Sequence, residues 1–304
     1  MALSEAPAVM ALRAERESRR LVALSAADID AGLALSDAAG WNQTADDWAI
    51  FVAQGHAIGH RDAANQLVAT AATLPYGTRA GWISMVLVAD VWRHRGLASE
   101  LMAECVAHLR AANIVPVLDA TPAGAAVYGR IGFEAGFEID RWEWRAASAD
   151  GAGSGPLASF AGTLRAAGSG DFEVLAALDR VATGLDRRFL LEDFLIRPGT
   201  SAWLSASGQG FVVAREGRRA MQIGPLVAEA SDSAIALLAA AFASARGHVD
   251  RVFLDLPRDR PELAVWLASQ GFTRQRPFVR MALGAAHPPT LGATSFVLAG
   301  PEFG

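Results

Sequence analysis

The feature that most constrains the fold of this 304-residue chain is an internal repeat with an offset of 139 residues. Val88, at the end of an apolar run, is matched by Val227, and Gly132, after a short helical pattern, is matched by Gly271. In both halves an apolar strand precedes an amphipathic helix, a second strand, a short helix and a closing strand. Because one offset relates both pairs, we predict two copies of one fold.

Local signals predict an α+β chain. Ser25 with Asp28, and Thr44 with Asp47, have the spacing of capping boxes at two helix starts, and Gly40 is placed to end the first helix. The N-terminal half is expected to hold strands at 19–25, 56–63, 66–77, 81–89, 113–121 and 137–145, with helices at 25–40, 44–55, 96–113 and 122–132. The C-terminal half is expected to hold strands at 222–228, 249–257 and 277–284, with helices at 233–247 and 261–272.

Small residues, glycines and one proline dominate residues 145–163 and are typical of a linker. We therefore predict a first domain at 1–148, a linker at 149–160 and a second domain at 161–304.

Composition excludes several classes of protein. The net charge is −5, so the chain has no overall basic field and we expect no nucleic-acid partner. The single cysteine, Cys105, excludes an intramolecular disulfide, and its helical spacing with apolar neighbours predicts a core position. No set of side chains has metal-ligand spacing, so we expect no metal. We see no secretory signal or membrane-spanning stretch, and we expect a cytoplasmic protein without a membrane partner.

The sequence WRHRGLAS follows the apolar run that ends near Val88. The first N–H groups of a helix lack intrahelical partners, and the helix dipole adds positive charge there. Gly96 and Ala98 leave room for a bulky anion, while Arg93 and Arg95 would attract one. The alternative is a solvated basic turn, but cations are unfavourable at a helix N-terminus unless an anion is bound.

Tyr128 stands four residues before Gly132 and Phe133, some 30 residues beyond the Arg-x-x-Gly-x-Ala of the basic turn. This pair of motifs resembles the GNAT superfamily of acyl-CoA-dependent N-acetyltransferases over residues 19–146. The resemblance implies two GNAT-type domains, each a mixed, mostly antiparallel central sheet flanked by helices, with acetyl-CoA as cosubstrate. It also implies that Tyr128 protonates the departing CoA thiolate. The implied acetyl-CoA contacts are backbone groups of Val86 and Val88 for the pantetheine arm, and Arg93, His94, Arg95, Gly96, Leu97, Ala98 and Ser99 for the pyrophosphate.

The sequence departs from the family pattern at the general base. No glutamate stands on the strand before the turn, and Asp119, at the end of the next strand, is the better candidate for that role. The alternative for Asp119 is a helix N-cap or a structural hydrogen bond. Further base candidates are His56, His60 and His94, and Thr121 stands where many relatives carry asparagine.

The acceptor pocket of the family falls near residues 40–48. Trp41, Asn42 and Trp48 could hold an apolar or aromatic amine, although Trp41 and Trp48 are seven residues apart and could simply belong to the core. Trp82 is a further candidate with the same alternative. We expect a small-molecule primary amine as acceptor, and a monomer or homodimer.

The second repeat departs further from the family. At the 139-residue offset, Gly96 becomes Ile235 and Tyr128 becomes Leu267, while Arg93 becomes Asp232 and Ala98 becomes Leu237. We therefore predict a degenerate second GNAT copy, whose pieces resemble the C-terminal domain of holothin-acetyltransferase-like tandem proteins. The predicted reaction is direct attack of the amine on acetyl-CoA. The alternative is an acyl-CoA sensor without turnover.

Overall fold

The structure is a computed structural model, and it describes residues 19–146, 163–285 and 292–304. The contacts divide these residues into two compact units. The first unit holds the described residues up to Leu74 together with Met85–His108. The second unit holds Pro75–Ser84 and the described residues from Leu109 onward. The predicted linker at 149–160 lies outside the described residues, so the domain boundaries stay a prediction.

The first unit confirms the local signals of the N-terminal sequence. The Thr44 hydroxyl accepts a hydrogen bond from the Asp47 N–H at 3.2 Å, and the Asp47 carboxylate accepts from the Thr44 N–H at 2.9 Å. This capping box starts the second helix, as predicted. The elements are β1 (Arg20–Ala23), 3-10 helix η1 (Ala26–Asp28), α2 (Ile29–Ala38), α3 (Ala45–Gln54), β2 (His56–Arg61) and β3 (Leu67–Tyr76), with β1, β2 and β3 joined in antiparallel pairs.

Strand β4 (Ala80–Val88) leads into 3-10 helix η2 (Asp90–Trp92) and helix α4 (Leu97–Ala111). Within this strand Met85 has a φ of +55°, which is unusual for a residue with a side chain. The Thr70 hydroxyl donates a 2.8 Å hydrogen bond to the Met85 carbonyl and stabilises this conformation. Beyond Met85, Val86 and Val88 are half-buried while Leu87 is buried, so the two valines share one face.

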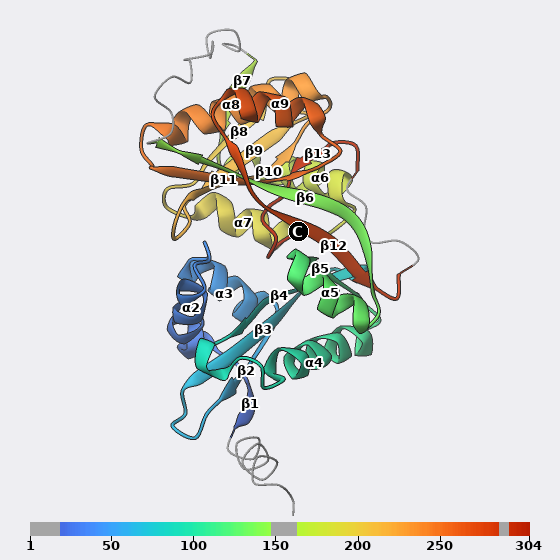
Figure 1. The fold of residues 1–304 in the computed structure, drawn as a ribbon. Coiled ribbons are helices and arrows are strands. Elements are labelled where there is room, and N and C mark those ends of the chain that lie inside the picture. The colour runs from blue at the N-terminus through green and yellow to red at the C-terminus, as the bar shows by residue number, and fades with distance from the viewer. Residues whose placement is uncertain (1–18, 147–162, 286–291) are drawn as a thin grey trace, which may run out of the picture. The chain divides into compact units, whose positions relative to one another are not determined.

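The second unit holds strands and helices predicted from the sequence, and it holds further elements at 164–215 that were not predicted. Its elements are β5 (Val115–Ala120), α5 (Pro122–Arg130), β6 (Phe133–Arg145), β7 (Leu164–Ala167), 3-10 helix η5 (Ser169–Asp171), α6 (Phe172–Thr183), α7 (Arg188–Ile196), β8 (Ser201–Ser205), β9 (Phe211–Arg215), β10 (Met221–Val227), α8 (Ser231–Arg246), β11 (Arg251–Pro257), α9 (Pro261–Ser269), β12 (Thr273–Leu283) and β13 (Ser295–Val297). Helix α8 contacts β8, β9, β10 and β11, and its apolar residues fill the core of this unit (Figure 1).

The offset of the repeat holds in the structure at the ends of β4 and β10 and at helices α5 and α9, whereas β5 and β11 begin only 136 positions apart. Helices α5 and α9 each begin with a proline and span nine residues, and Pro122 and Pro261 differ by the predicted 139 positions. Strands β4 and β10 end at Val88 and Val227, the pair noted in the sequence. Both strands pair in parallel with the next strand, β4 with β5 and β10 with β11. The neighbouring strands β1–β2, β2–β3, β5–β12, β12–β6, β6–β11, β10–β9, β9–β8, β8–β7 and β10–β13 are antiparallel. This confirms the predicted mixed, mostly antiparallel sheet.

The two repeats exchange their closing strands. The order in this unit is β5-β12-β6-β11-β10-β9-β8-β7, with β13 also paired to β10. Thus β12, from the second repeat, pairs with β5 of the first, and β6, from the first repeat, pairs with β11 of the second. Strands β6 and β12 also pair with each other and run side by side (Figure 1). Each repeat therefore depends on a strand supplied by the other.

Candidate active site

The basic turn lies between η2 and α4 in the first unit. Gly96 has a φ of +83° and immediately precedes helix α4, and its carbonyl accepts the first helical hydrogen bond, from the Glu100 N–H at 3.0 Å. A Cβ built on Gly96 would meet no atom within 4 Å, so open space adjoins the helix start. Leu97, Ala98 and Ser99 supply the first N–H groups of the helix. Open space, backbone donors and the positive helix end fit a diphosphate.

The arginines of this turn are exposed and locally engaged. Arg93 forms an ion pair with Asp90, with Nη2 2.7 Å from Oδ1, and about half of the Arg93 side chain remains exposed. Arg95 donates a 2.8 Å hydrogen bond to the Val91 carbonyl and lies over the Trp92 ring. His94 is exposed with a φ of +64°. Because exposed ion pairs contribute little free energy, an arriving diphosphate could exchange with Asp90 at small cost.

The predicted pantetheine strand has a free edge. The parallel ladder of β4 with β5 ends at the pair Trp82 and Val117, and in the described chain no strand pairs with that edge of β4 further on. The backbone groups near Val86 and Val88 lie on this later part of β4. A free strand edge can bind a ligand that carries amide groups, because its N–H and C=O groups need partners.

Tyr128 lies on α5 in the second unit, where it is half-buried. Its ring packs against Phe133 with the centroids 6.0 Å apart, and it covers Gly124 one turn earlier, where a Cβ would approach the ring to 3.1 Å. Thr121 is the N-cap of this helix, and its hydroxyl accepts from the Gly124 N–H at 3.3 Å. The phenol is thus held in place by its own helix and by the start of β6.

The side chain of Asp119, the candidate base, is fully buried and is paired with an arginine that the sequence did not single out. Its two carboxylate oxygens accept hydrogen bonds of 2.7 Å each from Nε and Nη2 of Arg280, on β12. Burial raises the pKa of the Asp119 carboxyl, and Arg280 opposes this effect without reversing it. The N-cap alternative does not apply, because Thr121 caps the helix, whereas the structural hydrogen bond is present.

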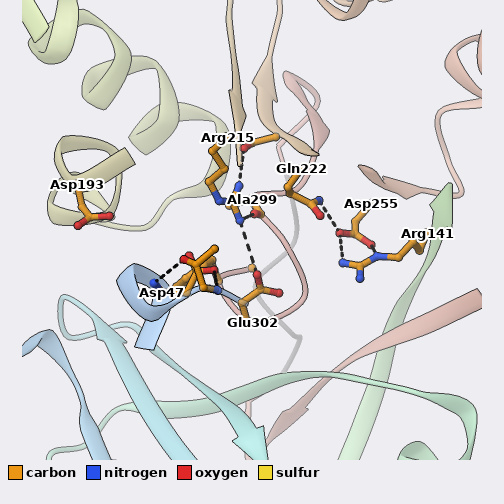
Figure 2. Close-up of polar contacts among 12 residues, drawn as sticks. Asp47, Arg141, Asp193, Arg215, Gln222, Asp255, Ala299 and Glu302 are labelled. Carbon is orange, nitrogen blue, oxygen red and sulfur yellow. Dashed lines mark hydrogen bonds and ion pairs between the residues drawn. The ribbon is translucent and has the colours of Figure 1, made fainter. Parts of the chain in front are cut away.

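A second buried ion pair of the same kind joins the two repeats on the other side of the strand exchange. Arg141 on β6 donates two hydrogen bonds of 2.8 Å to Asp255 on β11, and both side chains are buried (Figure 2). Arg141 and Arg280 differ by the 139-residue offset, Asp119 and Asp255 differ by 136 positions, and each arginine pairs with the aspartate of the other repeat. The second repeat has lost the glycine and the tyrosine, yet it keeps this pair. The reciprocal arrangement therefore favours the structural interpretation of Asp119, as a tie between exchanged strands.

Arg280 also identifies what the sequence analysis missed. Its guanidinium lies over the rings of Trp82 and Phe137, at 4.6 and 5.0 Å from their centroids. A signal existed, because Arg141 and Arg280 occupy equal positions in the two closing strands. Arginines are rarely fully buried unless a carboxylate pairs with them, so two arginines at equivalent strand positions indicate two buried ion pairs.

The remaining candidates lie in several places. His56 stacks on His108 with the ring centroids 4.2 Å apart, and burial, with His108 adding to it, lowers the pKa of His56. His60 is buried with Nε2 3.4 Å from Glu100 Oε2, and burial lowers its pKa, as does nearby Arg19. For both histidines, burial favours the neutral form of the imidazole.

The predicted acceptor residues are largely enclosed. Asn42 is buried and Trp41 half-buried, both between α2 and α3 in the first unit. Trp82 lies in the second unit, fully buried beside Tyr76 and Gly304. Trp82 therefore fills core space as well as bordering the Asp119–Arg280 pair.

The second repeat lacks the basic turn itself. In the first repeat, residues 89–96 connect β4 to α4, whereas only residues 228–230 connect β10 to α8. Asp232 lies in the first turn of α8, where a carboxylate suits the helix dipole and repels a diphosphate. Leu267, at the position of Tyr128, is fully buried in the core.

Within the described residues no group of three or more His, Cys, Asp or Glu side chains could hold a metal ion. Every described helix falls short of the length and apolar character that a membrane crossing requires. Cys105 is buried on α4, and burial raises the pKa of its thiol to about 12, so the thiol is not a ready nucleophile.

Comparison with known proteins agrees with this geometry. Residues 31–133 match the acetyltransferase (GNAT) family, and residues 175–295 match an acetyltransferase (GNAT) domain. No curated protein matches the sequence.

Solved structures share the fold of the whole chain. A protein from Pyrococcus horikoshii, solved as a candidate acetyltransferase, is similar with a TM-score of 0.75 and 17% identity, over 94% of this chain and 96% of that one. A tandem GNAT protein from the clavulanic acid biosynthesis pathway is similar with a TM-score of 0.61 and 17% identity, over 87% and 98%. A GCN5-related N-acetyltransferase from Sphaerobacter thermophilus gives 0.61 and 15%, over 91% and 98%. The chain therefore carries two GNAT acetyltransferase domains in tandem and belongs to the GNAT family.

Proposed function

We propose that the chain is an acyl-CoA-dependent N-acetyltransferase that acts on a primary amine of a small molecule, with its cosubstrate bound by the first repeat. The observation that carries this proposal is the open helix start at Gly96, next to the free edge of β4 that holds Val86 and Val88. The N–H groups of Leu97, Ala98 and Ser99 would bind the diphosphate of acetyl-CoA, and the free edge would bind its pantetheine amides.

The proposed reaction is a direct transfer of the acetyl group from the thioester to the amine. The amine nitrogen forms a bond to the thioester carbon, the carbon–sulfur bond breaks, the nitrogen loses a proton and the sulfur gains one. We assign the second proton transfer to the Tyr128 hydroxyl, since a phenol can donate a proton to a departing thiolate. We assign Trp41 and Asn42 to the acceptor side, and Trp82 to the support of β4. Asp119 stays a candidate base, although its pairing with Arg280 supports the structural role.

The cradle assignment predicts a selective effect on binding. Gly96→Glu should weaken acetyl-CoA binding by about 100-fold or more, because a carboxylate would face the diphosphate and like charges repel by several kcal/mol at close range. Gly96→Asn is the matched control, since asparagine tolerates a positive φ and adds no charge. Isothermal titration with acetyl-CoA measures both variants, and equal binding by the glutamate variant and wild type would contradict the assignment.

Tyr128→Phe should lower kcat by about two to three orders of magnitude while leaving acetyl-CoA binding unchanged, since a general acid typically contributes about 10²- to 10⁴-fold. Phenylalanine keeps the ring packed over Gly124. The chain offers a matched control in its other tyrosine, Tyr76, whose hydroxyl donates a 2.7 Å hydrogen bond to the Phe303 carbonyl. Tyr76→Phe should reduce stability rather than kcat. Thiol release with a panel of amines reports turnover, and undiminished kcat in Tyr128→Phe would refute the acid role.

A second candidate function is an acyl-CoA sensor without turnover. It is favoured by the pairing of Asp119, which leaves no assigned base on β5. Acetyl-CoA binding at Gly96 without thiol release for any amine would establish it.

A further inference from the structure

The short strand β13 occupies an unusual place in the second unit. The parallel ladder of β10 with β11 ends at the pair Ile223 and Leu254. Beyond it, β13 pairs antiparallel with β10, with Leu226 opposite Val297 and Val227 opposite Ser295. The next residue, Leu298, donates a 3.0 Å hydrogen bond from its N–H to the Asp255 carbonyl on β11. The segment thus bonds to both strands where their own pairing has ended.

The same edge is free in the first repeat. The offset of 139 residues places Leu226 and Val227 on Leu87 and Val88 of β4. The irregular positions also correspond, since Gly224, with a φ of +138°, stands at the position of Met85. Both parallel ladders are three residue pairs long. What differs is the neighbour: β13 covers the edge of β10, and in the described chain no strand covers the later part of β4.

The side chain of Arg260, in the second repeat, also binds β13 and the residues just before it. Arg260 precedes α9 and corresponds to Thr121, the N-cap of α5. Its Nε donates a 3.1 Å hydrogen bond to the Ser295 carbonyl, and its guanidinium lies 5.1 Å from the centroid of the Phe296 ring. Its Nη2 also reaches the carbonyls of Gly292 and Ala293. Ser295, Phe296 and Val297 are all buried.

We propose that residues 294–298 take, in the second repeat, the place that the pantetheine arm of acyl-CoA takes in the first. The cleft of the second repeat is then filled by an internal peptide ligand, and the chain binds one acyl-CoA. The inference rests on the proposed function for the position of the arm along β4. The shortened connection at 228–230 and the loss of the basic turn are consistent with it, because a cleft closed by peptide no longer needs a diphosphate site.

The first test counts binding sites in the full chain. Titration with acetyl-CoA should give one site per chain for wild type, and this site should be weakened by about 100-fold or more in Gly96→Glu. Two sites in wild type would overturn the inference, because the second cleft would then be open. One site of unchanged affinity in Gly96→Glu would contradict the cradle assignment, and it would overturn the inference only if acetyl-CoA also changed the hydrogen exchange of 295–298. If wild type binds no acetyl-CoA, the proposed function fails instead. Hydrogen exchange of residues 295–298 then shows whether the segment fills the cleft of the second repeat.

Hydrogen exchange tests the occupancy of the cleft without any cosubstrate. The amides of 295–298 should exchange slowly in wild type, and acetyl-CoA should not change their rates. Arg260→Ala should speed their exchange by at least about tenfold, since it removes a charge-assisted hydrogen bond to Ser295. Arg246→Ala, at the exposed end of α8, is the matched control and should leave these rates unchanged. Fast exchange of the segment in wild type would overturn the inference.

Discussion

A chain cut after residue 148 should lose the cooperative unfolding of the intact protein and expose the backbone of 115–145 to rapid hydrogen exchange. The reason is the exchange of closing strands. In such a fragment β5 lacks its neighbour β12, and β6 lacks partners on both edges, because β12 and β11 both come from the second repeat. Asp119 would also be left without Arg280. Unpaired edges of this length favour aggregation.

The matched control keeps all strands and breaks only the connection. A protease site introduced within 149–160 should yield two fragments that remain associated and unfold in one transition, since the pairing of β6 with β11 and of β12 with β5 is noncovalent. Size-exclusion chromatography and thermal denaturation measure both samples. A fragment of residues 1–148 that unfolds cooperatively as a soluble monomer would show that the exchange is dispensable for folding.

Local structure, including the strand–turn–helix geometry at Gly96, was predictable from the sequence because its causes lie within a few residues, whereas anion binding at this turn stays a prediction. Ser25 with Asp28 forms a capping box, and so does Thr44 with Asp47. At Gly96, the strand–turn–helix pattern placed a positive φ and free N–H groups together. Such features need no knowledge of distant contacts, and the structure bears them out.

The strand exchange could not be predicted in the same way. The alternation of residues in β6 and β12 is compatible with pairing inside one repeat or across both, because strand periodicity fixes the buried face and not the neighbour. Asp119 and Arg280 are separated by 161 positions, and no local rule joins them. The elements at 164–215 repeat the order of β1 to β3 but start 143–145 positions later rather than 139, so the fixed offset did not locate them. The role of Asp119 depended on this long-range contact.

The buried ion pair of Asp119 with Arg280 should make a large contribution to stability. Asp119→Asn should lower the free energy of unfolding by about 3–5 kcal/mol, because Arg280 would remain buried without a carboxylate. Arg280→Met should cost a similar amount, since burial already raises the pKa of the Asp119 carboxyl and its charge would lose the guanidinium that offsets it. Urea denaturation at neutral pH measures both variants.

The single variants Asp119→Leu and Arg280→Met, together with their double variant, separate pairing from catalysis. Replacing both members of a buried pair by apolar residues is often close to neutral, so the double variant should be more stable than either single change. A parallel cycle on Asp255 and Arg141 gives the control in the repeat that lacks the turn, although Gln222 also donates a 3.0 Å hydrogen bond to Asp255 (Figure 2). Similar coupling energies in both cycles would indicate one structural role.

Turnover of the double variant then decides the function of Asp119. If the carboxylate only ties the exchanged strands, the folded double variant should release thiol within about tenfold of the wild-type rate. A general base would leave a different signature, a loss of about 10²- to 10⁴-fold in kcat together with a changed acid limb of the pH profile. Because the two interpretations differ by at least an order of magnitude in a folded protein, a loss above a hundredfold would return Asp119 to the role of base.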